Sequence, residues 1–286
     1  WILGPLIGGL FIFGAEHSGN AGKFDSLITP YMLVGSTVIA VAIVFAFTRL
    51  PEINEKSETE KAEDPPMRNL LKHPAFIIAV VAQFLYVAAQ TGINSFFINY
   101  VTEEMLDVQV SIQKIMMHLG SFGKVFMPKN PEQAASLILA FGGMGLFWTG
   151  RLFGSYLMKF INPQRLLAVY AIVNTCLTFI VVMAWGWASV IALFSTYFFM
   201  SVMFPTIFAL GIKDLGPLTK KGSSFLVMAV AGGAFCPPLM GLMADTMSMS
   251  LAFLIPMGCF VFVAWYAIWG NKKQQSKFEN VKMLSV

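Results

Sequence analysis

Long apolar runs alternate with shorter polar segments along most of the 286-residue chain. A helix needs about 20 mainly apolar residues to cross the hydrocarbon core of a bilayer. Seven runs meet that length: 28–49, 74–100, 134–158, 164–185, 187–211, 223–245 and 249–270. The runs are continuous rather than alternating, and lipid requires each backbone polar group to find its partner within the segment, so we expect helices and not strands. The pattern predicts an all-α membrane protein.

Composition strengthens this prediction. Hydrophobic residues make up 57% of the chain and charged residues 12%, whereas a soluble domain has about 25% charged residues. The first residue is Trp1, and an apolar run over 1–14 follows at once. We interpret this run as the remainder of an eighth membrane segment, and the chain as an N-terminally truncated protein.

Two long polar links separate the apolar runs. The link at 51–73 carries six of the 15 acidic residues and the pair Pro65-Pro66, and is interpreted as a flexible tether between two helical bundles. The link at 102–133 mixes apolar residues with Lys114 and His118. Two interpretations of it are equally supported: a segment lying on the membrane surface, or a charged loop with incidental apolar residues.

The distribution of basic residues predicts the orientation. If the chain changes side at each predicted crossing, 14 of the 19 Lys and Arg residues lie on one side, 4 on the other, and Arg151 within a segment. Cytoplasmic loops carry the excess of positive charge in membrane proteins. The link at 51–73 and the tail at 271–286 are therefore expected in the cytoplasm, and the segment at 102–133 outside it.

Polar residues inside the apolar runs are candidates for function, because each costs free energy unless it faces protein or water. Gln83, Tyr86, Gln90 and Asn94 follow one another at spacings of 3, 4 and 4, which places them in one stripe on a helix, whereas Asn99 lies on the opposite face. The stripe predicts either a hydrogen-bonding wall of a substrate cavity or hydrogen bonding between helices, with equal support.

Other residues in the runs indicate structural or gating roles. Arg151 has three alternatives: a carboxylate partner, a substrate, or the cytoplasmic interface; we favour a gate-like structural role. Gly232, Gly233 and Pro237 interrupt segment 223–245, and Pro205 is expected to kink segment 187–211.

Several chemistries have no support in the sequence. The three histidines lie in or beside the polar links, and Cys176, Cys236 and Cys259 sit inside apolar runs, where we expect small buried hydrophobes rather than a disulfide or zinc site. No nucleophile elbow, phosphate-binding loop or HExxH pattern is present. An enzyme, a metal or cofactor requirement and a nucleic-acid partner are therefore not expected.

Three groups of residues resemble a known family. They are Phe204-Pro205-Thr206-Ile207-Phe208-Ala209-Leu210-Gly211-Ile212-Lys213 with Lys221-Gly222-Ser223-Ser224-Phe225, then Gln83-Phe84-Leu85-Tyr86-Val87-Ala88-Ala89-Gln90-Thr91, and Gly150-Arg151 with Gly154. In this order they resemble the L-fucose permease family of the major facilitator superfamily, which includes glucose/galactose transporters. The resemblance covers the chain apart from 102–133, which looks like an insertion.

The resemblance implies twelve helices in two bundles and alternating access to a sugar site between them. The chain would then run from the fifth helix to the twelfth. Residues 1–50 would end the N-terminal bundle, 51–73 would link the bundles, 74–270 would form the C-terminal bundle, and 271–286 a cytoplasmic tail. The family's proton-coupling carboxylates lie in its first and fourth helices, outside this chain.

The resemblance also implies a site. Gln90 and Asn94 would face the cavity, with Phe147 and Trp148 as stacking surfaces; Asn94 and Phe204 replace a Trp and a Tyr of the fucose permease, which favours a different hexose. Gln83 and Tyr86 complete the predicted sugar contacts, and Lys213 joins the gating residues. The expected function is proton-coupled monosaccharide uptake by a monomer in a bacterial cytoplasmic membrane. Alternatives are a facilitator or exporter of another polar solute, or a non-transporting sensor.

Overall fold

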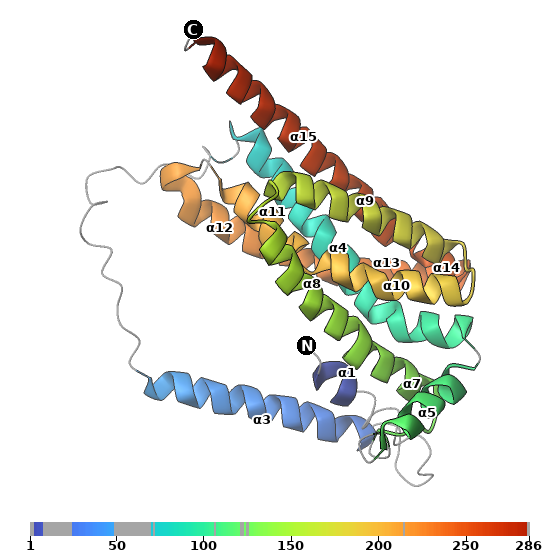
Figure 1. Cartoon of the computed structure of the whole chain (residues 1–286). Coiled ribbons are helices and arrows are strands. Elements are labelled where there is room, and N and C mark those ends of the chain that lie inside the picture. The colour runs from blue at the N-terminus through green and yellow to red at the C-terminus, as the bar shows by residue number, and fades with distance from the viewer. Residues whose placement is uncertain are drawn as a thin grey trace. The chain divides into compact units, whose positions relative to one another are not determined.

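The computed structural model describes residues 3–7, 25–48, 70, 72–105, 107–120, 123, 126–213 and 215–284, with the backbone alone for 3, 7, 25–27, 29–30 and 271–284. The regular elements in these ranges are all helices (Figure 1). The first are α1 (Leu3–Ile7), α3 (Asp25–Phe47), α4 (Pro74–Glu104), α5 (Val108–His118), α7 (Pro131–Leu137), η3 (Ile138–Gly143) and α8 (Met144–Leu157). They are followed by α9 (Pro163–Val182), α10 (Trp187–Met200), α11 (Met203–Ile212), η4 (Gly216–Leu218), α12 (Thr219–Met228), η5 (Ala229–Ala231), α13 (Gly232–Thr246), α14 (Met249–Ala252) and α15 (Leu254–Leu284).

Six helical stretches in the described part of the chain are long and apolar enough to cross a membrane. They are Pro74–Glu104, Pro131–Leu157, Pro163–Val182, Trp187–Ile212, Gly216–Thr246 and Met249–Gly270, and they confirm six of the predicted segments. The seventh, 28–49, falls on α3, whose apolar part is Tyr31–Phe47. Of the run 1–14, only α1 lies within the described residues, and the link at 51–73 lies outside them apart from Leu70, Lys72 and His73.

The chain divides into two compact units. The first comprises Trp1–Pro65 and Leu106–Ala140, and the second comprises Pro66–Met105 and Phe141–Val286. In the first unit, α5 is held to the segment before α7 by Gln109, which donates to the Lys129 carbonyl oxygen at 2.8 Å, and by Gln113, which donates to the Pro128 carbonyl oxygen at 2.8 Å. The segment 102–133 therefore contains a helix rather than an irregular loop. Contact of this helix with a membrane surface stays a prediction.

Proline and asparagine determine where several helices begin. Pro131 and Pro163 occupy the first turns of α7 and α9, where a missing N–H costs nothing. The preceding asparagines cap the same turns: Asn130 accepts from the Gln133 N–H at 3.0 Å, and Asn162 from the Gln164 N–H at 3.0 Å.

Three membrane-length stretches are not continuous α-helices. Residues 138–143 form a π-helical turn between α7 and α8. A turn at Ser201 and Val202 separates α10 from α11 and precedes Pro205, whose missing N–H would have paired with the carbonyl of Ser201. The predicted kink in segment 187–211 thus lies where the proline removes a hydrogen bond.

The interruption in segment 223–245 lies earlier than its prolines. The 3₁₀ turn η5 covers Ala229–Ala231, and α13 continues as an α-helix through Pro237 and Pro238. The prediction that the glycine–proline run itself interrupts the helix is therefore wrong in position. A close approach to α4, described below, accounts for the glycines that open α13.

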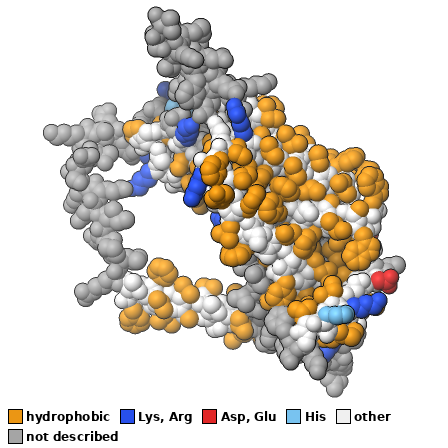
Figure 2. Space-filling model, in the orientation of Figure 1, with side chains coloured by type: hydrophobic (Ala, Val, Ile, Leu, Met, Phe, Trp, Pro, Cys, Tyr) orange, Lys and Arg blue, Asp and Glu red, His pale blue; other side chains and the backbone are white. Residues whose placement is uncertain are grey.

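The second unit is organised around α4. This helix packs against α13, α15, η5 and α11, while α9 packs against α15 and α10, and α10 against α8 (Figure 1). Tyr100 near the end of α4 donates its hydroxyl to the Val181 carbonyl oxygen of α9 at 2.8 Å and packs edge-on against Phe253. Figure 2 shows apolar side chains over much of the visible face of this unit, with Lys and Arg gathered towards one end.

Candidate functional site

The polar stripe of α4 runs between two packing surfaces of that helix. On one side, Tyr86 donates its hydroxyl to the Met200 carbonyl oxygen of α10 at 2.7 Å, and its ring meets Phe204 of α11 with 6.4 Å between centroids. On the other side, Phe84 packs against Phe235 of α13 at 5.7 Å. The stripe is therefore flanked by α10 and α11 on one side and by α13 on the other.

Glycine makes the second of these surfaces possible. A Cβ on Gly232 would collide with the backbone carbonyl oxygen of Phe84, and one on Gly233 would lie 2.7 Å from the Thr91 hydroxyl oxygen. Side chains at these positions would separate the two helices, because a backbone carbonyl cannot move aside as the tip of a side chain can. The glycine pair therefore allows the close approach of the two helices, whereas a gating role stays a prediction.

The inner half of the stripe, Gln83 and Tyr86, is enclosed within the second unit. Gln83 and Tyr86 are both fully buried. The Tyr86 hydroxyl has its partner in Met200, but neither amide atom of Gln83 has a hydrogen-bond partner among the residues that the structure describes. The Tyr86 bond is of the interhelical kind that the second interpretation of the stripe predicts, and Gln83 does not lie on an exposed face as the cavity-wall interpretation requires.

The outer half of the stripe is partly exposed. Gln90 and Asn94 are half-buried, and the side-chain oxygen of Asn94 has no hydrogen-bond partner in the described part of the chain. Each amide can donate and accept. The Asn94 oxygen is itself a buried atom, so Gln90 is the better placed of the two to meet a ligand with hydroxyl groups. Asn99, on the opposite face, is exposed.

The helix α8 carries three further candidates. Arg151 is exposed, and its guanidinium lies close enough to act electrostatically on the Tyr86 hydroxyl. Phe147 and Trp148 precede it by four and three residues and share its face of α8. Phe147 is half-buried, and Trp148 is 63% exposed. The main packing partner of α8 is α10, so the link between Arg151 and Tyr86 is the one relation between α8 and the stripe that the described residues give.

The remaining gating candidates lie apart from the stripe. Pro205 is half-buried near the start of α11, and Pro237 lies inside α13. Lys213 is exposed at the end of α11 and, with Lys159, borders a hollow of about 480 Å³ beside the α8–α9 connection. The structure does not bring this end of α11 together with Gln90 or Asn94.

Metal chemistry finds no support in the described residues, which contain no cluster of three or more His, Cys, Asp or Glu side chains. Cys236 and Cys259 are buried, as expected, but Cys176 is exposed on α9. The expectation that all three cysteines are buried is therefore wrong for Cys176, because its position on α9 faces outwards from the unit.

The structure also identifies buried polar groups that the sequence analysis passed over. Asn174 of α9 donates to the Met203 sulfur at 3.4 Å, while its side-chain oxygen and the Tyr197 hydroxyl have no partner within the described ranges. A lone amide in an apolar run is the signal by which Asn174 could have been found.

Comparisons with known proteins agree with this architecture. No protein-family model matches the chain. The chain is 33% identical over 246 residues to the L-fucose-proton symporter of Escherichia coli and covers 51% of that protein. It is 28% identical over 269 residues to the glucose/galactose transporter of Brucella abortus and covers 60% of it, and 29% identical over 286 residues to a putative glucose/galactose transporter of Helicobacter pylori, covering 63%.

A solved structure matches the fold as well. The crystal structure of FucP, a major facilitator superfamily transporter in the outward conformation, superposes with a TM-score of 0.63 at 33% identity, over 86% of this chain and 55% of that one. The chain thus spans about half to two thirds of the relatives it matches, and these relatives are transporters and not enzymes. The resemblance predicted from the sequence is confirmed: the chain is a homologue of the L-fucose–proton symporters and glucose/galactose transporters, with the fold of the major facilitator superfamily.

Proposed function

We propose that the protein carrying this chain is a secondary active transporter that takes up a monosaccharide together with protons by alternating access. The substrate class is L-fucose, glucose or galactose, as the names of the relatives suggest. The location proposed is a bacterial cytoplasmic membrane with the C-terminal tail in the cytoplasm, supported by the six apolar helices and the bias of basic residues. The working unit proposed is a monomer.

The observation that carries this proposal is the exposed half of the α4 stripe. Gln90 and Asn94 carry half-buried amides, and Arg151 of α8 lies close enough to act electrostatically on Tyr86 of the same stripe. Phe147 and Trp148 share the face of α8 that carries Arg151. Amides hydrogen-bond sugar hydroxyls, and aromatic rings cover the apolar face of a sugar ring. Phe204, held against Tyr86, supplies a further aromatic surface at the edge of this face. Because Gln83 is fully buried, it is left out of the proposed sugar contacts.

Proton coupling is proposed from the named activity of the Escherichia coli relative. In the described spans of the second unit, acidic side chains occur only near helix ends, at Glu103, Glu104 and Asp245. The unit described here is accordingly proposed to supply sugar contacts rather than the coupling carboxylates. Alternation would rock one bundle against the other around the site.

Uptake into proteoliposomes tests the function. The full-length protein should accumulate at least one of labelled L-fucose, D-glucose and D-galactose when an inward proton gradient is imposed. Without the gradient, uptake should stop when the sugar concentrations inside and outside the proteoliposomes are equal. Absence of uptake for all three sugars would overturn the sugar assignment, and equal accumulation without a gradient would overturn proton coupling. Equilibration that ignores the gradient would favour a facilitator.

The site is tested by Gln90→Ala with Asn99→Ala as the matched control on the opposite face of α4. The loss of one or two hydrogen bonds of about 1 kcal/mol each should raise the sugar Kd by about fivefold to thirtyfold. Expression and thermal stability should stay unchanged for both variants. Unchanged binding by Gln90→Ala would show that this amide packs rather than recognises.

A further inference from the structure

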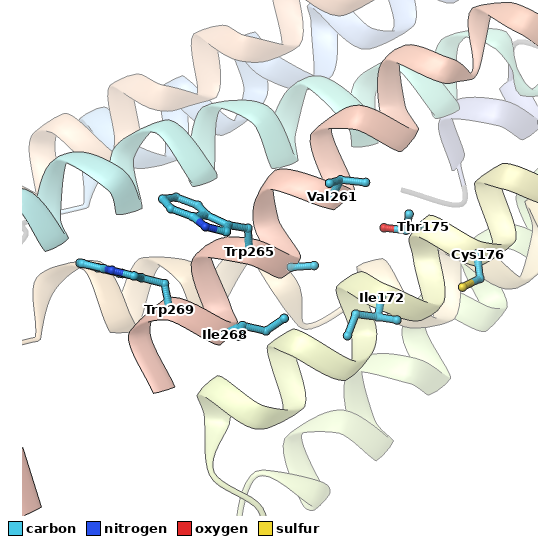
Figure 3. Close-up of a pocket in the computed structure, with 8 residues that line it drawn as sticks. Ile172, Thr175, Cys176, Val261, Trp265, Ile268 and Trp269 are labelled. Atoms are coloured by element: carbon cyan, nitrogen blue, oxygen red, sulfur yellow. The ribbon is translucent and has the colours of Figure 1, made fainter. Parts of the chain in front are cut away.

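An apolar groove lies between α9 and α15, on a part of the second unit that the proposed sugar site does not use (Figure 3). Its volume is about 450 Å³, within the range of ~300–1,000 Å³ that is usual for ligand pockets. It is lined by Ile172, Thr175, Cys176, Val261, Ala264, Trp265, Ile268 and Trp269. The only hydroxyl among these side chains, on Thr175, donates to the Ala171 carbonyl oxygen at 2.8 Å. It therefore needs no hydrogen-bond acceptor from a molecule bound in the groove.

The length of the groove matches one leaflet of a bilayer. From Val261 to Trp269 the lining covers eight residue steps of α15, or about 12 Å at ~1.5 Å per residue. One leaflet contributes about 15 Å of the ~30 Å hydrocarbon core. A groove of this length and polarity fits an extended acyl chain.

Aromatic residues mark one end of the groove. Trp265 and Trp269 lie one turn apart with centroids separated by 6.4 Å and planes within 20° of each other. Figure 3 shows Trp269 and Ile268 at the end away from Thr175 and Cys176. Tryptophan is enriched where the hydrocarbon core meets the lipid headgroups. This end of the groove is therefore its headgroup end.

Positive charge lies at the same end. Gln164, at the start of α9, faces Gly270, the residue after Trp269. Arg165 follows Gln164 and is exposed, and the sequence places Lys272 and Lys273 just beyond Gly270. Neither α9 nor α15 carries an acidic residue before Glu279. A basic end above an apolar groove complements an anionic lipid and not a zwitterionic one.

We propose that the groove between α9 and α15 binds one acyl chain of an anionic phospholipid whose headgroup is held by Arg165. The lipid comes from the leaflet that contacts the basic end of the unit. Its binding requires no sugar, so its failure would leave the proposed transport function untouched.

Fluorescence quenching by brominated lipids tests the proposal, because bromine on an acyl chain quenches tryptophan at contact. The full-length protein is reconstituted in phosphatidylethanolamine with a minor fraction of brominated phosphatidylglycerol, or with the bromine on the phosphatidylethanolamine instead. The signal of the groove is the part of the quenching that disappears in the double variant Trp265→Phe, Trp269→Phe. In that part of the quenching, phosphatidylglycerol should be preferred about fivefold over phosphatidylethanolamine. This is the preference that one basic residue near an anionic surface contributes.

Two variants separate the headgroup contact from general attraction to anionic lipid. Arg165→Gln should abolish the preference, whereas Lys159→Gln should keep it, because Lys159 lies over the Tyr156 ring of α8, away from the groove. Equal quenching by the two lipids in the wild-type protein would overturn the proposal. A second result would also overturn it: neither lipid quenches the groove tryptophans, and Cys176 residues of two copies can be cross-linked. A second copy of the chain would then cover the groove.

Discussion

The two halves of the α4 stripe carry the same kinds of side chain but differ in burial. Gln83 and Tyr86 are enclosed by the surrounding helices, whereas Gln90 and Asn94 are partly exposed. Helical spacing places all four on one face and cannot separate them. The difference in burial teaches that one stripe serves two purposes: its inner half is part of the packing of the unit, and its outer half is available to a ligand.

The largest expected effect falls on the buried half. Tyr86→Ala should lower the free energy of unfolding by about 3–5 kcal/mol, because it removes a buried ring and its hydrogen bond to Met200. Denaturant unfolding in detergent measures this change. Tyr156→Ala, at a tyrosine that is 56% exposed, should cost less than ~1 kcal/mol. Similar costs for the two variants would mean that Tyr86 contributes no more to packing than a surface residue.

The exposed half should respond in binding rather than in stability. If the proposed sugar site is right, Asn94→Leu should raise the Kd for the hexose by about tenfold, since the replacement cannot hydrogen-bond a hydroxyl. Its unfolding midpoint should not fall below that of the wild type, because the Asn94 oxygen has no hydrogen-bond partner to lose among the described residues. Ser95→Ala, at the exposed neighbouring residue, is the control for changes in α4 and should bind normally. A loss of stability without a loss of affinity would assign Asn94 to the packing half.

The smallest effect has the opposite sign. Gln83→Leu should stabilise the protein by about 1 kcal/mol, because a buried amide without partners costs about 1–3 kcal/mol. Sugar affinity should not change. Gln90→Leu should give a smaller gain or none, since Gln90 is only half-buried. If Gln83→Leu unfolds more readily than the wild type, the Gln83 amide has a partner in the folded protein, and the contrast between the halves is weaker.

The sequence predicts the helices well where local chemistry decides them. Pro74 and Pro163 begin α4 and α9 close to the expected residues, because proline suits the first turn. The end of α4 was expected at residue 100 but lies at Glu104, because Tyr100 and Val101 are buried and Thr102 satisfies its hydroxyl on the carbonyls of the same helix.

The candidate site is only partly predictable from the sequence. Periodicity and resemblance give the stripe on α4, but its division into buried and exposed halves depends on Met200, Phe204 and Gly232, which lie more than 100 residues away in the chain. The interruption at 229–231, ahead of Pro237, likewise depends on how closely α13 approaches α4. Such long-range packing leaves no local signal in composition or spacing.

The contact between Gly232 and Phe84 also limits which codons the gene can tolerate. Every missense change in a glycine codon installs at least a Cβ, and at position 232 that atom would overlap a main-chain oxygen. At Gly241, on the same helix, the nearest atom to such a Cβ is 3.6 Å away, an ordinary contact with the Phe96 ring. A random library selected for growth on the transported sugar should retain glycine codons at 232, while alanine and serine codons survive at 241.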